Sequence, residues 1–71
     1  MIHKALRVFR QFHKYTQLEA AERLGISKSY LSEIESGKKI INTDLLQKFA
    51  DLYEMPVSSL VFFSETLHSS E

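Results

Sequence analysis

Helix start and stop signals in the first half of the sequence are the feature that most constrains the fold of this chain. Thr16 and Glu19 form a capping box, because the Thr16 hydroxyl can accept from the Glu19 amide while the Glu19 carboxylate accepts from the Thr16 amide. Gly25 tolerates the left-handed conformation that ends a helix abruptly. Ser27 can then cap a further helix over residues 28–36. The sequence therefore predicts two helices joined by a three-residue turn.

Apolar residues recur at three- and four-residue intervals along the whole chain, which is the period of an amphipathic helix. The first dozen residues form one such helix, Thr43 and Asp44 suit the start of another, and Pro56 suits the first turn of the last. We therefore predict an all-α fold of five short helices without strands. The positions expected to face the core are Ile2, Ala5, Leu6, Phe9, Phe12, Leu18, Ala21, Leu24, Leu31, Ile34, Leu45, Leu46, Phe49, Leu52, Tyr53, Val57, Leu60 and Val61.

Composition narrows the class of protein. The 71 residues suffice for one small domain, predicted over residues 1–64 and followed by a polar tail over residues 65–71. The absence of cysteine excludes disulfides and thiolate zinc sites. The longest apolar run has four residues, too few to cross a membrane, and the start of the chain lacks the apolar core of a signal peptide. These features predict a cytoplasmic protein that makes no membrane contact.

Charge is distributed unevenly although the formal net charge is zero. Residues 1–41 contain eight basic and four acidic side chains, a net charge of +4. Residues 42–71 contain one basic and five acidic side chains, a net charge of −4. Such an asymmetry indicates one half that faces a polyanion and one half with another task.

The outward face of the helix over residues 28–36 is the candidate functional surface. At 100° per residue, Leu31 and Ile34 lie on its inner face. Short side chains opposite them would let the backbone approach base edges in a major groove, where Lys28 could donate to guanine and Glu33 could accept from cytosine. Taken alone, the same pattern is also typical of an ordinary solvated face. The outward residues are Lys28, Ser29, Ser32, Glu33 and Ser36.

One string of residues matches a known family. Its members are Thr16, Gln17, Leu18, Ala21, Leu24, Gly25, Ile26, Ser27, Ser29, Leu31, Ile34, Glu35 and Gly37. This pattern resembles the lambda-repressor-like (Cro/repressor, XRE-type) helix-turn-helix family, and the resemblance extends from about Leu6 to Leu60. It implies a lambda-repressor-like domain with a central helix-turn-helix, and a transcriptional regulator that binds double-stranded DNA.

The resemblance also implies roles for single residues. Lys28, Ser29, Ser32 and Glu33 match the positions that contact bases. The positions that contact DNA phosphates correspond to Gln17, Ser36, Lys38, Lys39, Asn42 and Thr43. Arg10 and Glu35 match a salt bridge that joins the first helix to the third in some relatives. The chain departs from the family at Leu18–Ala21, where Glu-Leu-Ala is commoner, at Ile40 and Ile41, which replace a loop proline, and at Glu54, which replaces a helix-ending glycine.

Catalysis is not expected. His3, His13 and His68 lack the spacing of metal ligands, and the sequence contains neither a nucleophile motif nor a phosphate-binding glycine loop. The sequence therefore predicts no enzyme activity, no metal and no cofactor.

The last helix predicts assembly. It has more apolar side chains than one stripe can bury, so we expect a homodimer interface formed by Leu60, Phe62, Phe63 and Leu67. Two-fold symmetry would then match a near-palindromic operator, bound by a repressor or autoregulator. The alternatives are a monomer with the phenylalanines folded over the first helix, an antitoxin or protein-interaction module that binds a partner through the C-terminal helix, and the DNA-binding domain of a longer repressor.

Overall fold

The computed structural model describes the backbone of residues 2–69 and the side chains of residues 2–64. The described backbone contains five α-helices and no strand, which confirms the predicted all-α fold. No helix among residues 2–69 is long and apolar enough to cross a membrane. The helices are α1 (Ile2–Phe12), α2 (Gln17–Leu24), α3 (Lys28–Glu35), α4 (Thr43–Leu52) and α5 (Val57–Ser69).

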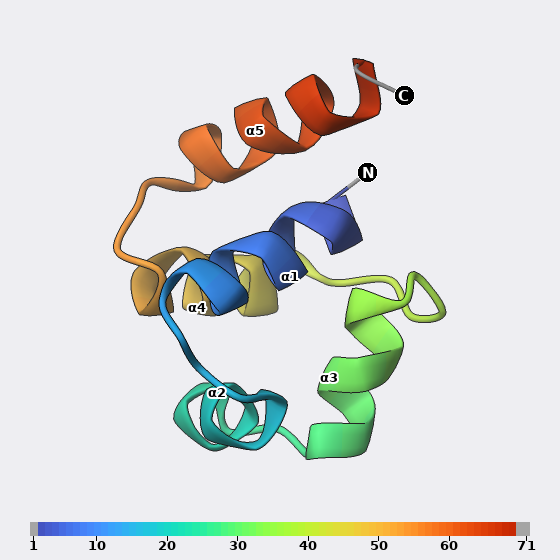
Figure 1. Ribbon diagram of the computed structural model, residues 1–71, viewed down its shortest axis with the longest axis vertical. Helices are drawn as coiled ribbons and strands as arrows, with labels where there is room; N and C mark the ends of the chain where they lie inside the picture. Colours follow the sequence, from blue (N-terminus) through green and yellow to red (C-terminus); the bar gives the residue numbers. More distant parts are fainter. Residues whose placement is uncertain (1, 70–71) are drawn as a thin grey trace.

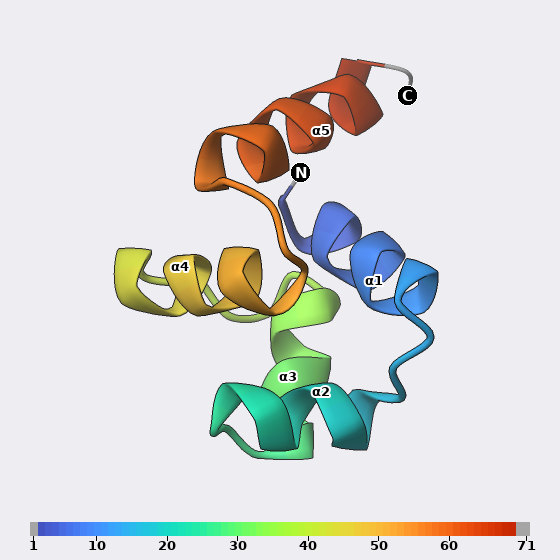
Figure 2. The same cartoon turned by 90° about the vertical axis from the view of Figure 1, so that its left-hand side faces the viewer.

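The helices are arranged along a long axis of 30 Å, with 23 Å across each of the other two. Both views place α5 at one end of this axis and α2 at the other (Figures 1 and 2). Helix α1 packs against α5 and α3, while α2 packs against α3 and α4. Helix α5 continues through Ser69, so the predicted domain boundary at residue 64 falls inside this helix.

The caps of α2 and α3 follow the local sequence. Thr16 Oγ1 accepts from the Glu19 amide at 3.1 Å, and Glu19 Oε1 accepts from the Thr16 amide at 2.9 Å, which completes the capping box. This backbone donor holds the pKa of Glu19 below its usual value. Gly25 has a left-handed φ of 75° after α2, and Ser27 Oγ accepts from the Tyr30 amide at 3.0 Å at the start of α3. The turn geometry of the predicted pair of helices is therefore confirmed.

Two other helices end on left-handed residues that are not glycine. Lys14 has a φ of 61° after α1, and Glu54 has a φ of 58° after α4. Each turn is then closed by a backbone hydrogen bond between residues five positions apart. One runs from the Tyr15 amide to the Arg10 carbonyl, and the other from the Met55 amide to the Ala50 carbonyl. Glu54 thus occupies the conformation that explains why a glycine is usual there.

The core forms where the five helices meet. Its fully buried large side chains are Leu6, Leu24, Leu31, Ile34, Phe49, Tyr53 and Leu60. Most of the predicted core positions are confirmed, but three large ones, Leu18, Phe12 and Val61, are wrong because their side chains are exposed. Leu18 is 53% exposed, because the buried face of α2 is formed by Ala20, Ala21 and Leu24, and Leu18 lies beside that face.

Phe12 is the second wrong core position, since its side chain is 77% exposed. It is the last residue of α1, and its ring meets the His13 ring edge-on at 5.5 Å. His13 takes the inward place instead, stacked between Tyr53 at 5.5 Å and Tyr15 at 6.2 Å. The aromatic stack therefore fills the space that helical periodicity alone assigns to Phe12.

Candidate nucleic-acid interface

The outward side chains of α3 line a shared hollow with the start of α2. The hollow is open to solvent, has a volume of about 460 Å³, and is lined by Gln17, Lys28, Ser29, Ser32 and Glu33. Lys28, Ser29 and Ser32 are exposed, and Glu33 is half-buried. Within the part of the chain that the structure describes, the side chains of Lys28, Ser29, Ser32 and Glu33 form no hydrogen bond or ion pair. The four residues predicted to contact bases thus lie together and remain available to a ligand.

The back of α3 is anchored by an ion pair to α1. Arg10 Nε donates to Glu35 Oε2 at 2.7 Å, and Arg10 Nη2 donates to Glu35 Oε1 at 3.1 Å. The two side chains are 11% and 3% exposed, so the predicted pair is present and is buried rather than superficial. Arg10 Nη1 also donates to the Tyr15 carbonyl at 2.9 Å, which ties the pair to the segment that leads into α2. This arrangement holds α1, α2 and α3 in one relative position.

Gln17 joins the same network. Its Nε2 donates to Glu35 Oε1 at 3.1 Å, so one N–H is used inside the protein. An amide nitrogen has two hydrogens, and the second stays free to donate outward. Gln17 therefore links the buried Arg10–Glu35 pair to the candidate surface, because it both bonds to Glu35 and lines the hollow.

The family to which the chain belongs indicates what kind of protein has this surface. A family model described as helix-turn-helix matches residues 6–60. The chain belongs to the helix-turn-helix family.

Curated relatives agree with this assignment. The uncharacterized HTH-type transcriptional regulator YazB of Bacillus subtilis is 37% identical over 57 residues, which cover 80% of this chain and 83% of YazB. The HTH-type transcriptional regulator ImmR of the same organism is 37% identical over 68 residues, 96% of this chain and 54% of ImmR. Antitoxin PezA of Streptococcus pneumoniae is 31% identical over 71 residues, 100% of this chain and 45% of PezA. The chain therefore spans about half the length of ImmR and of PezA.

Solved structures of regulators share the fold. The clp gene regulator ClgR of Corynebacterium glutamicum superposes with a TM-score of 0.85 at 30% identity, over 97% of this chain and 77% of ClgR. SinR, a master regulator for biofilm formation solved in complex with DNA, superposes with a TM-score of 0.79 at 31% identity, over 86% of this chain and 98% of SinR. The resemblance to XRE-type helix-turn-helix regulators and the lambda-repressor-like fold are thereby confirmed.

Apart from Gln17, which begins α2, the residues predicted to contact phosphates follow α3 in this helix-turn-helix protein. Lys38 and Lys39 are exposed in the turn after Gly37, and Thr43 is exposed at the start of α4. Ser36 is exposed too, but its hydroxyl donates to the Glu33 carbonyl at 3.1 Å. Asn42 has a second role that the sequence reading missed, because its Oδ1 caps α4 by accepting from the Leu45 amide at 2.8 Å. The sequence signal for this role was an asparagine placed directly before the first residue of a predicted helix.

The predicted dimer residues of α5 do not share one surface. Leu60 is fully buried in the core of the helix-turn-helix domain, so its assignment to a dimer interface is wrong. Phe63 is half-buried, and its ring lies 4.7 Å from the ring of Phe9 on α1. Phe62 is 72% exposed. The side chain of Leu67 lies outside the described residues. Helical geometry explains the split, because residues 60 and 64 point inward and residue 62 points away from them.

Tyr53 is a buried polar residue that the sequence reading treated only as apolar. Its hydroxyl has no hydrogen-bond partner among residues 2–64. Burial raises the pKa of this phenol, and the nearby negative charge of Glu35 raises it further. The phenol is therefore held neutral beside the Arg10–Glu35 pair.

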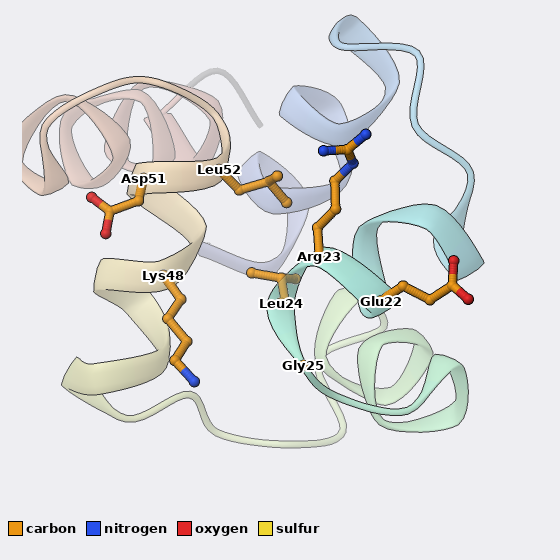
Figure 3. A pocket seen from close by; sticks show the side chains of 7 residues that line it. All are labelled: Glu22, Arg23, Leu24, Gly25, Lys48, Asp51 and Leu52. Atoms are coloured by element: carbon orange, nitrogen blue, oxygen red, sulfur yellow. The ribbon is translucent and has the colours of Figure 1, made fainter.

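A second hollow lies away from the predicted DNA residues, between α2 and α4. It has a volume of about 560 Å³ and is open to solvent. Figure 3 shows Leu24 and Leu52 between the two helices, with charged side chains extending outward around them. Both signs of charge are present, from Glu22, Arg23, Lys48 and Asp51. This hollow contains none of the residues that the sequence assigned to DNA.

Proposed function

We propose that the chain is a sequence-specific DNA-binding transcriptional regulator that places α3 in the major groove. The observation that supports this most directly is the hollow at α3, in which Lys28, Ser29, Ser32 and Glu33 are unpaired within the described residues and lie beside Gln17. Side chains of this kind match the donor and acceptor pattern of base edges. The proposed activity is DNA binding without catalysis, and the proposed place of action is the cytoplasm, in keeping with membership of a family of DNA-binding regulators.

The charged pair in the hollow gives the proposal a base preference. A lysine ammonium donates to guanine O6 and N7, whereas a carboxylate accepts from cytosine N4, and such contacts are worth about 1–3 kcal/mol of discrimination. Glu33 also repels the phosphates, so its carboxylate is unfavourable in the groove unless it meets an amino group. We therefore expect Lys28 to select a guanine and Glu33 to select a cytosine.

The phosphate contacts are assigned to the rim of the same surface. Lys38 and Lys39 are exposed in the turn after α3, and Gln17 has one amide hydrogen left to donate. Ser36, Asn42 and Thr43 complete the proposed set, with Asn42 donating through the amide nitrogen that its capping role leaves free. Contacts of this kind position a protein on the duplex and make its affinity depend on salt.

We further propose a homodimer, with Phe62 at the centre of its interface and Phe63 at the edge. Helix α5 and helix α2 lie at opposite ends of the 30 Å axis (Figures 1 and 2). Two copies that meet through α5 would therefore leave both α2–α3 units uncovered. A two-fold axis that also turns both α3 helices toward one face would match half-sites about 34–36 Å apart in a near-palindromic operator. Occupation of such an operator fits a repressor or autoregulator.

Selection of bound sequences from random duplex DNA, followed by titration at several salt concentrations, tests the proposal. We expect an enriched near-palindromic motif and an affinity that falls linearly with salt on logarithmic axes. Lys38→Ala and Lys39→Ala should each reduce that slope by about one and weaken all duplexes alike. Lys48→Ala, which removes an exposed cation from α4 beside the second hollow, is the matched control and should change neither quantity. Failure to enrich any motif would refute sequence-specific binding.

A second candidate is a protein-interaction module of the antitoxin kind. The similarity to Antitoxin PezA over the whole chain and the exposed ring of Phe62 favour it. In that case Phe62 would contact a different protein instead of a second copy. A monomer in solution that forms a defined complex with another protein through α5 would support this candidate over the homodimer.

A further inference from the structure

The net positive charge before residue 42 belongs to residues 2–18, most of which form α1. Residues 2–18 contain four basic side chains and no acidic one, which accounts for the whole net charge of +4 before residue 42. Residues 19–41, which include α2, α3 and the lysine turn, contain four basic and four acidic side chains and are neutral overall. A surface that contacts DNA needs cations opposite the phosphates. The cations of residues 19–41 are balanced by as many acidic side chains, so the further cations of residues 2–18 are candidates for additional phosphate contacts.

Both ends of α1 touch the candidate interface. A side chain added at Gly37, directly before Lys38, would begin 3.3 Å from the His3 ring. Figure 1 likewise shows the start of α1 near the turn that follows α3. At its other end, Arg10 bonds to Glu35 in the last turn of α3. Helix α1 therefore runs along the end of α3, from the lysine turn toward the start of α2.

Arg7 lies between these two anchor points. It follows His3 by four residues and precedes Arg10 by three, so the three side chains share one face of α1. Arg10 is paired with Glu35, whereas Arg7 is exposed and forms no ion pair with any described residue. Burial lowers the pKa of His3, and the nearby charges of Lys4 and Arg7 lower it further, so Arg7 lies close enough to His3 for the two groups to interact.

We propose that Arg7 binds a DNA phosphate and extends the phosphate contacts from the lysine turn along α1. The ligand is the backbone of duplex DNA, and the guanidinium suits it because its planar fork can donate two bonds to one phosphate. Lys14 is a further exposed cation in the turn between α1 and α2. The inference rests on the proposed function, and it adds a contact outside the helix-turn-helix.

The test compares Arg7→Gln and Arg7→Lys with the unchanged protein. Each is titrated with its selected duplex and with an unrelated duplex, at salt concentrations from 50 to about 300 mM, a range over which phosphate contacts dominate affinity. Lys48→Gln is the matched control, because it removes one exposed cation from α4 on the side of the second hollow (Figure 3). Arg7 and Lys48 are both exposed, so the variants should melt at the temperature of the parent.

We expect Arg7→Gln to reduce the salt slope by about 0.9, to weaken both duplexes by the same factor, and to leave the selected motif unchanged. Arg7→Lys should keep most of the slope, and Lys48→Gln should keep all of it. An unchanged slope in Arg7→Gln, or an equal loss in Lys48→Gln, would overturn the assignment of Arg7 while the binding function stands. A parent protein that binds neither duplex would instead overturn the proposed function.

Discussion

Removal of Arg10 should be among the most damaging single changes to this protein. In Arg10→Met the carboxylate of Glu35, which is 3% exposed, would keep only the bond from Gln17. Breaking a buried ion pair on one side costs about 3–5 kcal/mol, because an uncompensated charge is left in the interior. The Tyr15 carbonyl would lose a donor as well.

The magnitude matters because the domain is small. At about 0.05–0.15 kcal/mol per residue, 71 residues correspond to a free energy of unfolding of about 4–11 kcal/mol. Arg10→Met would therefore remove a large part of the total. With an m-value of about 1.5 kcal/mol per molar, within the range for small proteins, the urea midpoint should fall by about 2–3 M.

The decisive control is the double variant Arg10→Met/Glu35→Met. It removes both charges, and apolar replacement of a whole buried pair is often neutral or stabilising. We therefore expect the double variant to unfold at a higher urea concentration than Arg10→Met. Far-ultraviolet circular dichroism, which reports the helix content, follows the unfolding of both variants. A loss below about 1 kcal/mol in Arg10→Met, or a double variant no more stable than the single one, would refute the reasoning.

Three further predictions concern single side chains. Tyr53→Phe should leave thermal stability unchanged or raise it by up to about 1 kcal/mol, because the buried hydroxyl lacks a partner among the described residues; a larger loss in a thermal melt would contradict this. Glu54→Gly should raise the melting temperature by a few degrees by relieving a left-handed φ of 58°, whereas Glu54→Ala, which keeps the Cβ, should not. Phe62→Asp should give a folded monomer in sedimentation analysis, whereas Leu60→Asp should unfold the chain; a Phe62→Asp dimer would exclude α5 as the interface.

Local signals in the sequence predicted the elements well. The capping box at Thr16, the cap at Ser27 and the left-handed turn at Gly25 are properties of neighbouring residues, so each appears in the structure where the sequence placed it. The four candidate base contacts were also predictable, because one helix face brings them together once its apolar side is known. The pairing of Arg10 with Glu35 came only from the family resemblance, since nothing in the local sequence links positions 25 residues apart.

The sequence by itself therefore determined the number of helices, most of their ends and the polar face of α3, because these depend on contacts within a few residues. Only the tertiary structure decided which side chains of the apolar pattern stay out of the core. Leu18 and Phe12 have helical spacing but lie beside the packed faces, and Ala20 and His13 take the inner places, because neighbouring helices fix the space that is left. The same packing buried Leu60, turned Phe63 onto Phe9 and left Phe62 outside. It also aligned Arg7 between two contacts to the α3 end, a placement that depends on how α1 crosses the fold.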